Sequence, residues 1–155
     1  MQMSSDSRAG ERLGPEVLIW RRVFPGGLDQ APAARRFVRF LLGDTPFAED
    51  AELIVGELAG NALRHTRSGS AGGHFTVEVT LTPAPCRMPT RAAGVLLTVF
   101  DLGGGGSPCF GGPGAPYEEN GRGLSIVHAL ATRAGHQGTP ATGHRVWAYL
   151  SASGG

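Results

Sequence analysis

The amino-acid sequence predicts an α/β fold, a two-layer sandwich in which a mixed, mainly antiparallel sheet carries three helices on one face. Residues 28–43 repeat their apolar side chains at helical spacing, whereas residues 74–83 alternate apolar and polar side chains as a half-buried strand does. A second strand pattern, at 94–101, follows the first without a helix between them, which favours hairpin pairing. A long stretch rich in Gly and Pro then interrupts the pattern of elements.

Local signals mark where most of these elements begin and end. Pro25 closes a first strand that is rich in β-branched and aromatic residues, and Gly43 is placed to end the first helix. Pro46 lies where a second helix can begin, and Gly135 is expected to end the third. The expected order is a strand at 16–25, helices at 28–43 and 46–65, strands at 74–83 and 94–101, a loop at 102–120, a helix at 121–135 and a strand at 144–151.

Length and composition indicate one globular domain. The chain has 155 residues, 41% of them apolar and 17% charged, and we expect a single domain at 15–151 after a flexible lead-in at 1–14. A net charge of +1 provides no strong field for nucleic acid or for an anionic membrane. No segment approaches the roughly 20 apolar residues that span a bilayer. The first residues lack the apolar core of a signal peptide, so a cytoplasmic location is expected.

Two absences narrow the chemistry. All 14 basic residues are Arg, so neither a phosphate-binding P-loop, which needs a Lys, nor a lysine Schiff base is available. Cys86 and Cys109 are not in a CxxC pair and have no His at ligand spacing, which argues against a metal or redox site built on them.

The second helix carries an unusual polar stripe. Glu57, Asn61 and His65 recur at intervals of four, so successive members lie about 40° apart around the helix. They border an apolar arc. The arc consists of Ile54, Val55, Leu58 and Ala62. The stripe is either a solvated polar edge, or a site in which hard oxygen ligands hold Mg²⁺ and a carboxylate accepts a proton.

Two further stretches have a structural and a functional interpretation. Asp101 ends an apolar strand and four glycines follow it. One interpretation is that Asp101 and the glycines form a turn that ends the strand. The other is that the Asp101 carboxylate accepts a hydrogen bond from an exocyclic amine of a ligand, which the glycines allow to approach the backbone closely. Gly121 and Gly123 precede a helix whose free N–H groups could bind an anion, although two glycines alone are weak evidence.

Taken together, "ELAGNALRHT", "DLGGGG" and "GRGLSIV" resemble the N, G1 and G2 boxes of the histidine-kinase-like ATPases. The nearest resemblance is to the small bacterial anti-sigma-factor serine/threonine kinases, to which "PAARRFVRFLL" and "GHRVWAYL" are also similar. The resemblance covers roughly residues 17–150 and implies that residues 102–120 form an ATP lid.

The resemblance assigns roles to individual residues. It implies that Asn61 holds Mg²⁺ against the phosphates of ATP, that Glu57 is the general base and that Asp101 binds the adenine amine. The last strand departs from the family, because His144 and Arg145 stand where relatives often carry Lys and a small hydroxyl residue. The remaining nucleotide contacts would come from Gly103, Gly105, Gly121, Arg122, Gly123 and Leu124.

The resemblance also suggests what the ATP is for. A histidine autokinase would need a phosphoacceptor His before His65, and a gyrase-like machine would need a following transducer domain, so we expect a stand-alone domain. The leading expectation is a homodimeric anti-sigma-factor kinase that phosphorylates a small antagonist protein. The first helix would bind the sigma factor or the antagonist through Arg35, Arg36 and Arg39. The alternatives are a non-catalytic module gated by nucleotide, and, less favoured, a scaffold that binds no nucleotide.

Overall fold

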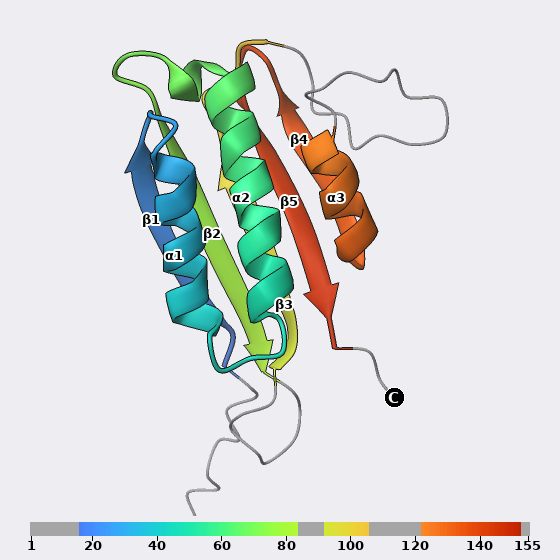
Figure 1. Ribbon diagram of the computed structural model, residues 1–155. Helices are drawn as coiled ribbons and strands as arrows, with labels where there is room; N and C mark the ends of the chain where they lie inside the picture. The colour runs from blue at the N-terminus through green and yellow to red at the C-terminus, as the bar shows by residue number, and fades with distance from the viewer. Residues whose placement is uncertain (1–15, 84–91, 106–121, 153–155) are drawn as a thin grey trace, which may run out of the picture.

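The computed structural model describes residues 16–83, 92–105 and 122–152. The expected lead-in at 1–14, both cysteines, Gly121 and most of the expected lid lie outside these residues. The elements are β1 (Leu18–Pro25), α1 (Gln30–Leu42), α2 (Ala48–His65), a short 3-10 helix η1 (Arg67–Gly69), β2 (His74–Pro83), β3 (Ala92–Phe100), α3 (Arg122–Leu130), β4 (Arg133–Thr139) and β5 (Gly143–Ser151) (Figure 1).

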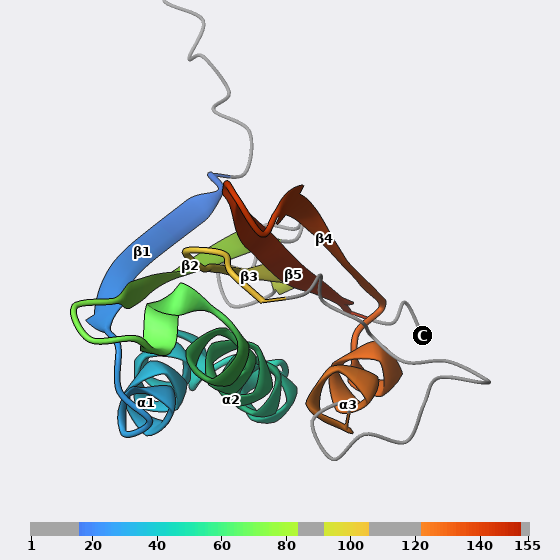
Figure 2. The same ribbon diagram turned by 90° about the horizontal axis from the view of Figure 1, so that it is seen from above.

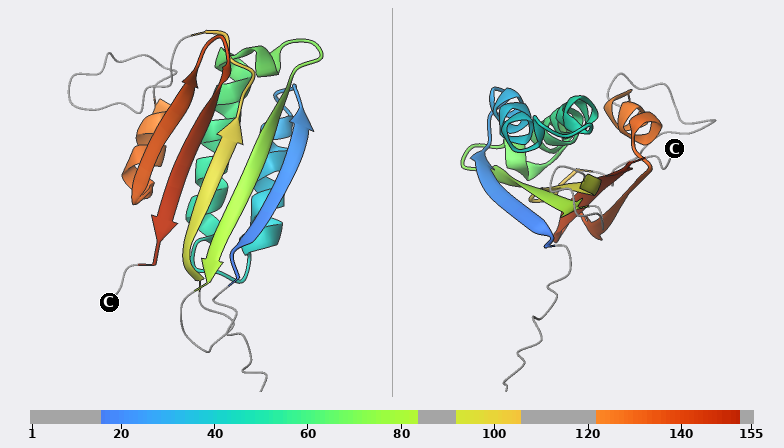
Figure 3. Two further views of the ribbon diagram at one scale, coloured as in Figure 1. Left: turned by 180° about the vertical axis from the view of Figure 1, so that it is seen from behind. Right: turned by 90° about the horizontal axis from the view of Figure 1, so that it is seen from below.

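The two-layer α/β sandwich is confirmed. The five strands form one sheet in the order β1-β2-β3-β5-β4. Seen from above, α1, α2 and α3 all lie on the same side of this sheet (Figure 2). The view from behind shows that no helix of the described chain covers the other face (Figure 3).

One strand was missed, and it changes the sheet. The third helix was expected to continue to Gly135, but α3 ends at Leu130 and Arg133–Thr139 forms β4, an edge strand paired with β5. Its sequence, RAGHQGT, has two glycines and little apolar alternation, so its strand conformation depends on pairing with β5.

The missed strand also explains why the sheet is antiparallel rather than mixed. All four pairings among the described strands are antiparallel. A helix that connected β3 directly to an adjacent β5 would give a parallel pair. Because β4 lies between α3 and β5 in the chain, β5 returns in the opposite direction and inserts between β3 and β4.

The core lies between the sheet and the helices. Phe24 of β1 stacks on Phe75 of β2 with ring centroids 5.3 Å apart, and both rings are buried. Ile54, Val55 and Leu58 of α2 are buried as well, each contributing about 1.5–3 kcal/mol by burial. The predicted apolar arc of α2 therefore faces the sheet. Within the described parts of the chain, no helix is long and apolar enough to cross a bilayer.

Candidate functional site

Four segments that are far apart in sequence meet at one end of the sandwich. They are the C-terminal half of α2, the loop at 101–105 after β3, the first turn of α3 and the turn that leads into β5 (Figure 1). The three motifs identified in the sequence are therefore brought to one edge of the molecule.

The polar stripe of α2 borders the buried face, as predicted. Glu57 and Asn61 are partly exposed, and neither side chain forms a hydrogen bond or ion pair with another described residue. The Oε2 atom of Glu57 lies against Gly123 at the start of α3, where a Cβ atom would collide with it. The carboxylate is thus held beside the backbone of the α3 N-terminus while its oxygens remain free of ion pairs with described residues.

The loop after β3 depends on glycine. Gly103 has a φ of 75° and Gly105 a φ of 68°, in the left-handed region that side chains rarely adopt. A Cβ atom at Gly103 would strike the carbonyl oxygen of Pro140, and one at Gly105 would strike that of His65. The glycines therefore let this loop pass directly between the end of α2 and the turn before β5.

Arg67 holds this loop, although the sequence analysis did not identify it. Its backbone N–H donates to the carbonyl of Gly103 at 2.7 Å, and its guanidinium Nη2 donates to the carbonyls of Leu102 at 3.0 Å and Pro140 at 3.4 Å. Ser68 adds an Oγ acceptor for the N–H of Leu102 at 2.9 Å. A single Arg after a helix end carries no recognisable sequence signal, so only the folded chain reveals this role.

Asp101 is less available than the sequence suggested. Its side chain is 4% exposed, and its Oδ1 atom accepts hydrogen bonds from the backbone N–H groups of Gly103 at 2.7 Å and His144 at 3.0 Å. The Nδ1 atom of His144 lies 3.1 Å from the same oxygen. Asp101 therefore organises its own loop and the start of β5 before any ligand binds.

His144 is the second functional candidate that the sequence analysis did not assign. Its side chain is 0% exposed, and no group in the described part of the chain forms a hydrogen bond with its Nε2 atom. The available signal was the departure of "GHRVW" from the resembled family, which marked the position without indicating its contact with Asp101.

The first turn of α3 offers backbone N–H groups. Leu124 is 3% exposed and belongs to the hydrophobic core, so its possible contribution to an anion site is its N–H group. Arg122 begins the helix and Gly123 follows it. Free N–H groups at a helix N-terminus bind anions such as phosphate.

This arrangement fits a nucleotide better than a metal ion alone. The described residues contain no group of three His, Cys, Asp or Glu side chains that could hold a metal. One amide oxygen, that of Asn61, is suited to a Mg²⁺ ion whose other ligands are phosphate oxygens and water. The space that a Cβ atom would take at Gly103 and Gly123 is filled by the Pro140 carbonyl and the Glu57 carboxylate, so these glycines bring the segments of the site together.

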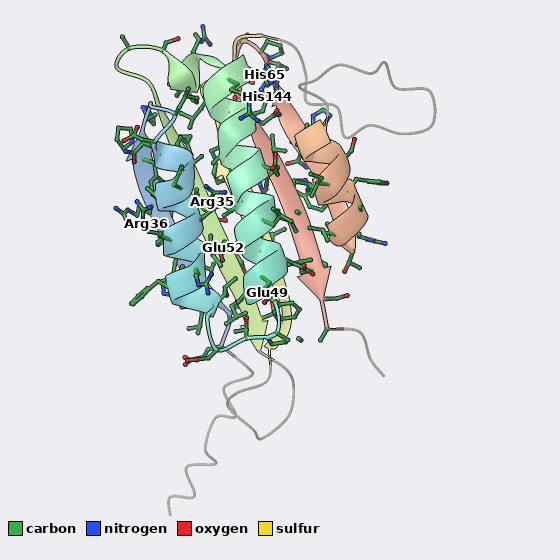
Figure 4. The ribbon with its side chains drawn as sticks, in the orientation of Figure 1. Arg35, Arg36, Glu49, Glu52, His65 and His144 are labelled. Atoms are coloured by element: carbon green, nitrogen blue, oxygen red, sulfur yellow. The ribbon has the colours of Figure 1, made fainter. Side chains whose placement is uncertain are left out.

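The arginines of α1 lie on a different surface from this site. Arg39 pairs with Glu52 of α2 at 3.0 Å, and Arg35 packs over Gly56, where a Cβ atom would lie 2.8 Å from its Cδ. Arg36 points away from α2 (Figure 4). Two of the three residues predicted to bind a partner therefore also connect α1 to α2.

Comparison with known proteins agrees with the geometry. The family model of the histidine kinase-like ATPase domain matches residues 24–149 of this chain. No curated protein matches the chain.

Proposed function

The chain belongs to the histidine kinase-like ATPase family, and from this premise we propose that it is a cytoplasmic anti-sigma-factor serine/threonine kinase that uses Mg-ATP. Family membership supports ATP binding by a regulatory protein. The observation that carries the kinase proposal is the position of Glu57, a carboxylate without an ion pair among the described residues, held against Gly123 at the start of α3.

The site would bind ATP along the line of the three motifs. The glycine loop after Asp101 would bind the adenine base of ATP, and the N–H groups at the start of α3 would bind its phosphates. Asn61 provides the amide oxygen for Mg²⁺, and a bound Mg²⁺ would neutralise the charge that develops on the phosphates.

Glu57 has the position and the chemistry of a general base. As the hydroxyl oxygen of a substrate serine bonds to the γ-phosphorus, its proton passes to the Glu57 carboxylate. The bond between the γ-phosphorus and the β,γ-bridging oxygen breaks, and ADP leaves. The protein contributes mainly position and electrostatics to such a transfer.

The proposed partners are a sigma factor and a small antagonist protein, bound by a homodimer through α1. Arg35, Arg36 and Arg39 are all exposed on that helix. Arg is enriched at interface hot spots because its planar guanidinium group forms bidentate pairs with carboxylates. The partner surface that contacts α1 is therefore expected to be acidic.

Two measurements test the proposal. Calorimetry of the purified protein with ATP and Mg²⁺ tests nucleotide binding, and single-turnover transfer from labelled ATP to a candidate antagonist tests the kinase activity. Binding without transfer to any captured partner would favour the non-catalytic module, in which nucleotide occupancy changes partner affinity. Absence of ATP binding would overturn both proposals.

A further inference from the structure

The side chain of Arg67 connects two segments that are far apart in the sequence. Its Nε and Nη2 atoms donate to the carbonyl oxygen of Leu102 at 3.3 Å and 3.0 Å, and Nη2 also donates to the carbonyl oxygen of Pro140 at 3.4 Å. Leu102 belongs to the loop that follows β3, and Pro140 lies in the turn between β4 and β5. One guanidinium group therefore ties η1 to both segments.

The loop after β3 needs such ties to keep one conformation. Gly103, Gly104 and Gly105 have successive φ angles of 75°, 79° and 68°. Glycine loses more conformational freedom on ordering than any other residue, so three in succession are costly to fix. Bonds to other segments supply the order: the N–H of Gly104 donates to the Pro140 carbonyl, and the N–H of Arg67 to the Gly103 carbonyl, each at 2.7 Å.

The guanidinium group is placed to order this loop rather than to stabilise the core. Arg67 is exposed, and its side chain bonds only to backbone carbonyls among the described residues. Leu102 lies outside the hydrophobic core between the sheet and the helices. A segment of this kind can open locally while the packed core stays folded. Loss of the guanidinium should therefore loosen the loop without unfolding the protein.

We propose that Arg67 is a positioning residue for nucleotide binding, which orders the loop at 102–105 before ATP arrives. The inference rests on the proposed binding of ATP beside this loop, and it adds a residue that strengthens binding without contacting the nucleotide. When only a fraction of the protein has the binding-competent conformation, the apparent affinity falls by that fraction. Transfer from ATP that is already bound should not change, because bound ATP itself keeps the loop ordered.

Arg67→Met tests the inference, because it removes the guanidinium donors and keeps an aliphatic side chain and the backbone N–H. ATP affinity, measured by calorimetry, should fall about 10-fold, the effect of losing one hydrogen bond to a charged group. The binding entropy should become less favourable, since ATP must then order the loop. Single-turnover transfer at saturating ATP should stay within about 2-fold of wild type. Unchanged affinity, or a loss confined to the transfer rate, would overturn the inference.

Arg64→Met is the matched control. Arg64 is an exposed arginine in the last turn of α2, and its side chain forms no hydrogen bond or ion pair with a described residue. The control should keep wild-type affinity, and an equal loss there would show a general effect of charge.

ADP separates positioning from direct contact with the terminal phosphate. A loosened loop should weaken ADP and ATP by the same factor in Arg67→Met, because both nucleotides need the same loop. A larger loss for ATP would mean that Arg67 contacts the terminal phosphate, and the positioning role would be wrong.

A measurement on the unmodified protein covers the case in which Arg67→Met fails to fold. Without ATP, the amides of Leu102 and Gly104 should exchange hydrogen slowly, because they donate to Ser68 Oγ at 2.9 Å and to the Pro140 carbonyl at 2.7 Å. Exchange as fast as in an unstructured chain would show that the loop is not ordered in advance and would overturn the inference. A wild-type protein that binds no ATP refutes the proposed function as well, whereas equal ATP affinity in wild type and Arg67→Met refutes this inference alone.

Discussion

The carboxylate of Glu57 occupies the space in which a Cβ atom of residue 123 would stand. Helix α2 and the start of α3 can approach this closely because residue 123 is glycine. The relationship links two motifs that are far apart in the sequence, and it makes the position of Glu57 sensitive to a change on another helix.

Gly123→Ala should displace the Glu57 carboxylate with little effect on the fold. The colliding atom is the free end of a flexible side chain, and Ala is a better helix former than Gly. Phosphoryl transfer should fall by about 10²-fold, the effect of a misplacement of about 1 Å. Single-turnover transfer measures this loss, and thermal unfolding checks the fold. If Gly123→Ala acts only by displacing Glu57, it should not slow phosphoryl transfer further in a protein that already carries Glu57→Gln. An additive loss of rate in the double variant would show that Gly123 affects transfer by another route.

Glu57→Gln alone should bind ATP normally and transfer phosphate about 10²- to 10⁴-fold more slowly, because the amide cannot accept the serine proton. Calorimetry and single-turnover transfer to the cognate substrate are the two measurements. Unchanged transfer would remove Glu57 from the role of general base.

Asn61→Ala should abolish the contribution of Mg²⁺ to ATP binding and leave the fold intact. The Asn61 side chain is partly exposed and bonds to no other described residue, so its removal leaves no buried group unpaired. ATP affinity with Mg²⁺ and with a chelator gives the metal contribution for each protein. Equal contributions in wild type and variant would refute the ligand assignment.

Asp101→Asn should lower both stability and the preference for ATP over GTP. Oδ1 accepts from two backbone N–H groups and from the ring of His144, and hydrogen bonds to a charged group contribute about 1.5–3 kcal/mol each. Denaturant unfolding and competition binding measure the two effects. A variant with wild-type stability and wild-type base preference would mean that Asp101 merely ends a strand.

Arg39→Glu should weaken partner binding without changing ATP affinity, because α1 contributes no residue to the nucleotide site. We expect a loss of a few kcal/mol if the residue is desolvated in the complex and under about 1 kcal/mol if it stays exposed. The same expectation holds for Arg35→Glu.

A charge swap separates this effect from the ion pair with Glu52, which should itself contribute under about 1 kcal/mol because Arg39 is 71% exposed. Arg39→Glu combined with Glu52→Arg restores the pair and should still bind the partner poorly. Recovered binding in the swapped protein would show that the pair, and not a partner contact, was lost.

The sequence by itself determined the features that depend on neighbouring residues. The burial of Leu58 beside the half-exposed Glu57 and Asn61 follows from the 3.6-residue period of a helix, which is set by local backbone geometry. The hairpin of β2 and β3 follows in the same way from alternation, since strand residues face opposite sides of the sheet. The family and its motifs were also recognisable from consecutive residues.

Only the tertiary structure decided what depends on contacts between distant segments. Strand β4 has a weak local pattern, so its conformation is set by pairing with β5, and that pairing makes the sheet antiparallel. Arg67 of η1 donates to the carbonyl of Leu102, and His144 of β5 contacts Asp101 at the end of β3. No spacing in the sequence encodes these contacts, because they exist only once packing has brought the segments to the same end of the sheet.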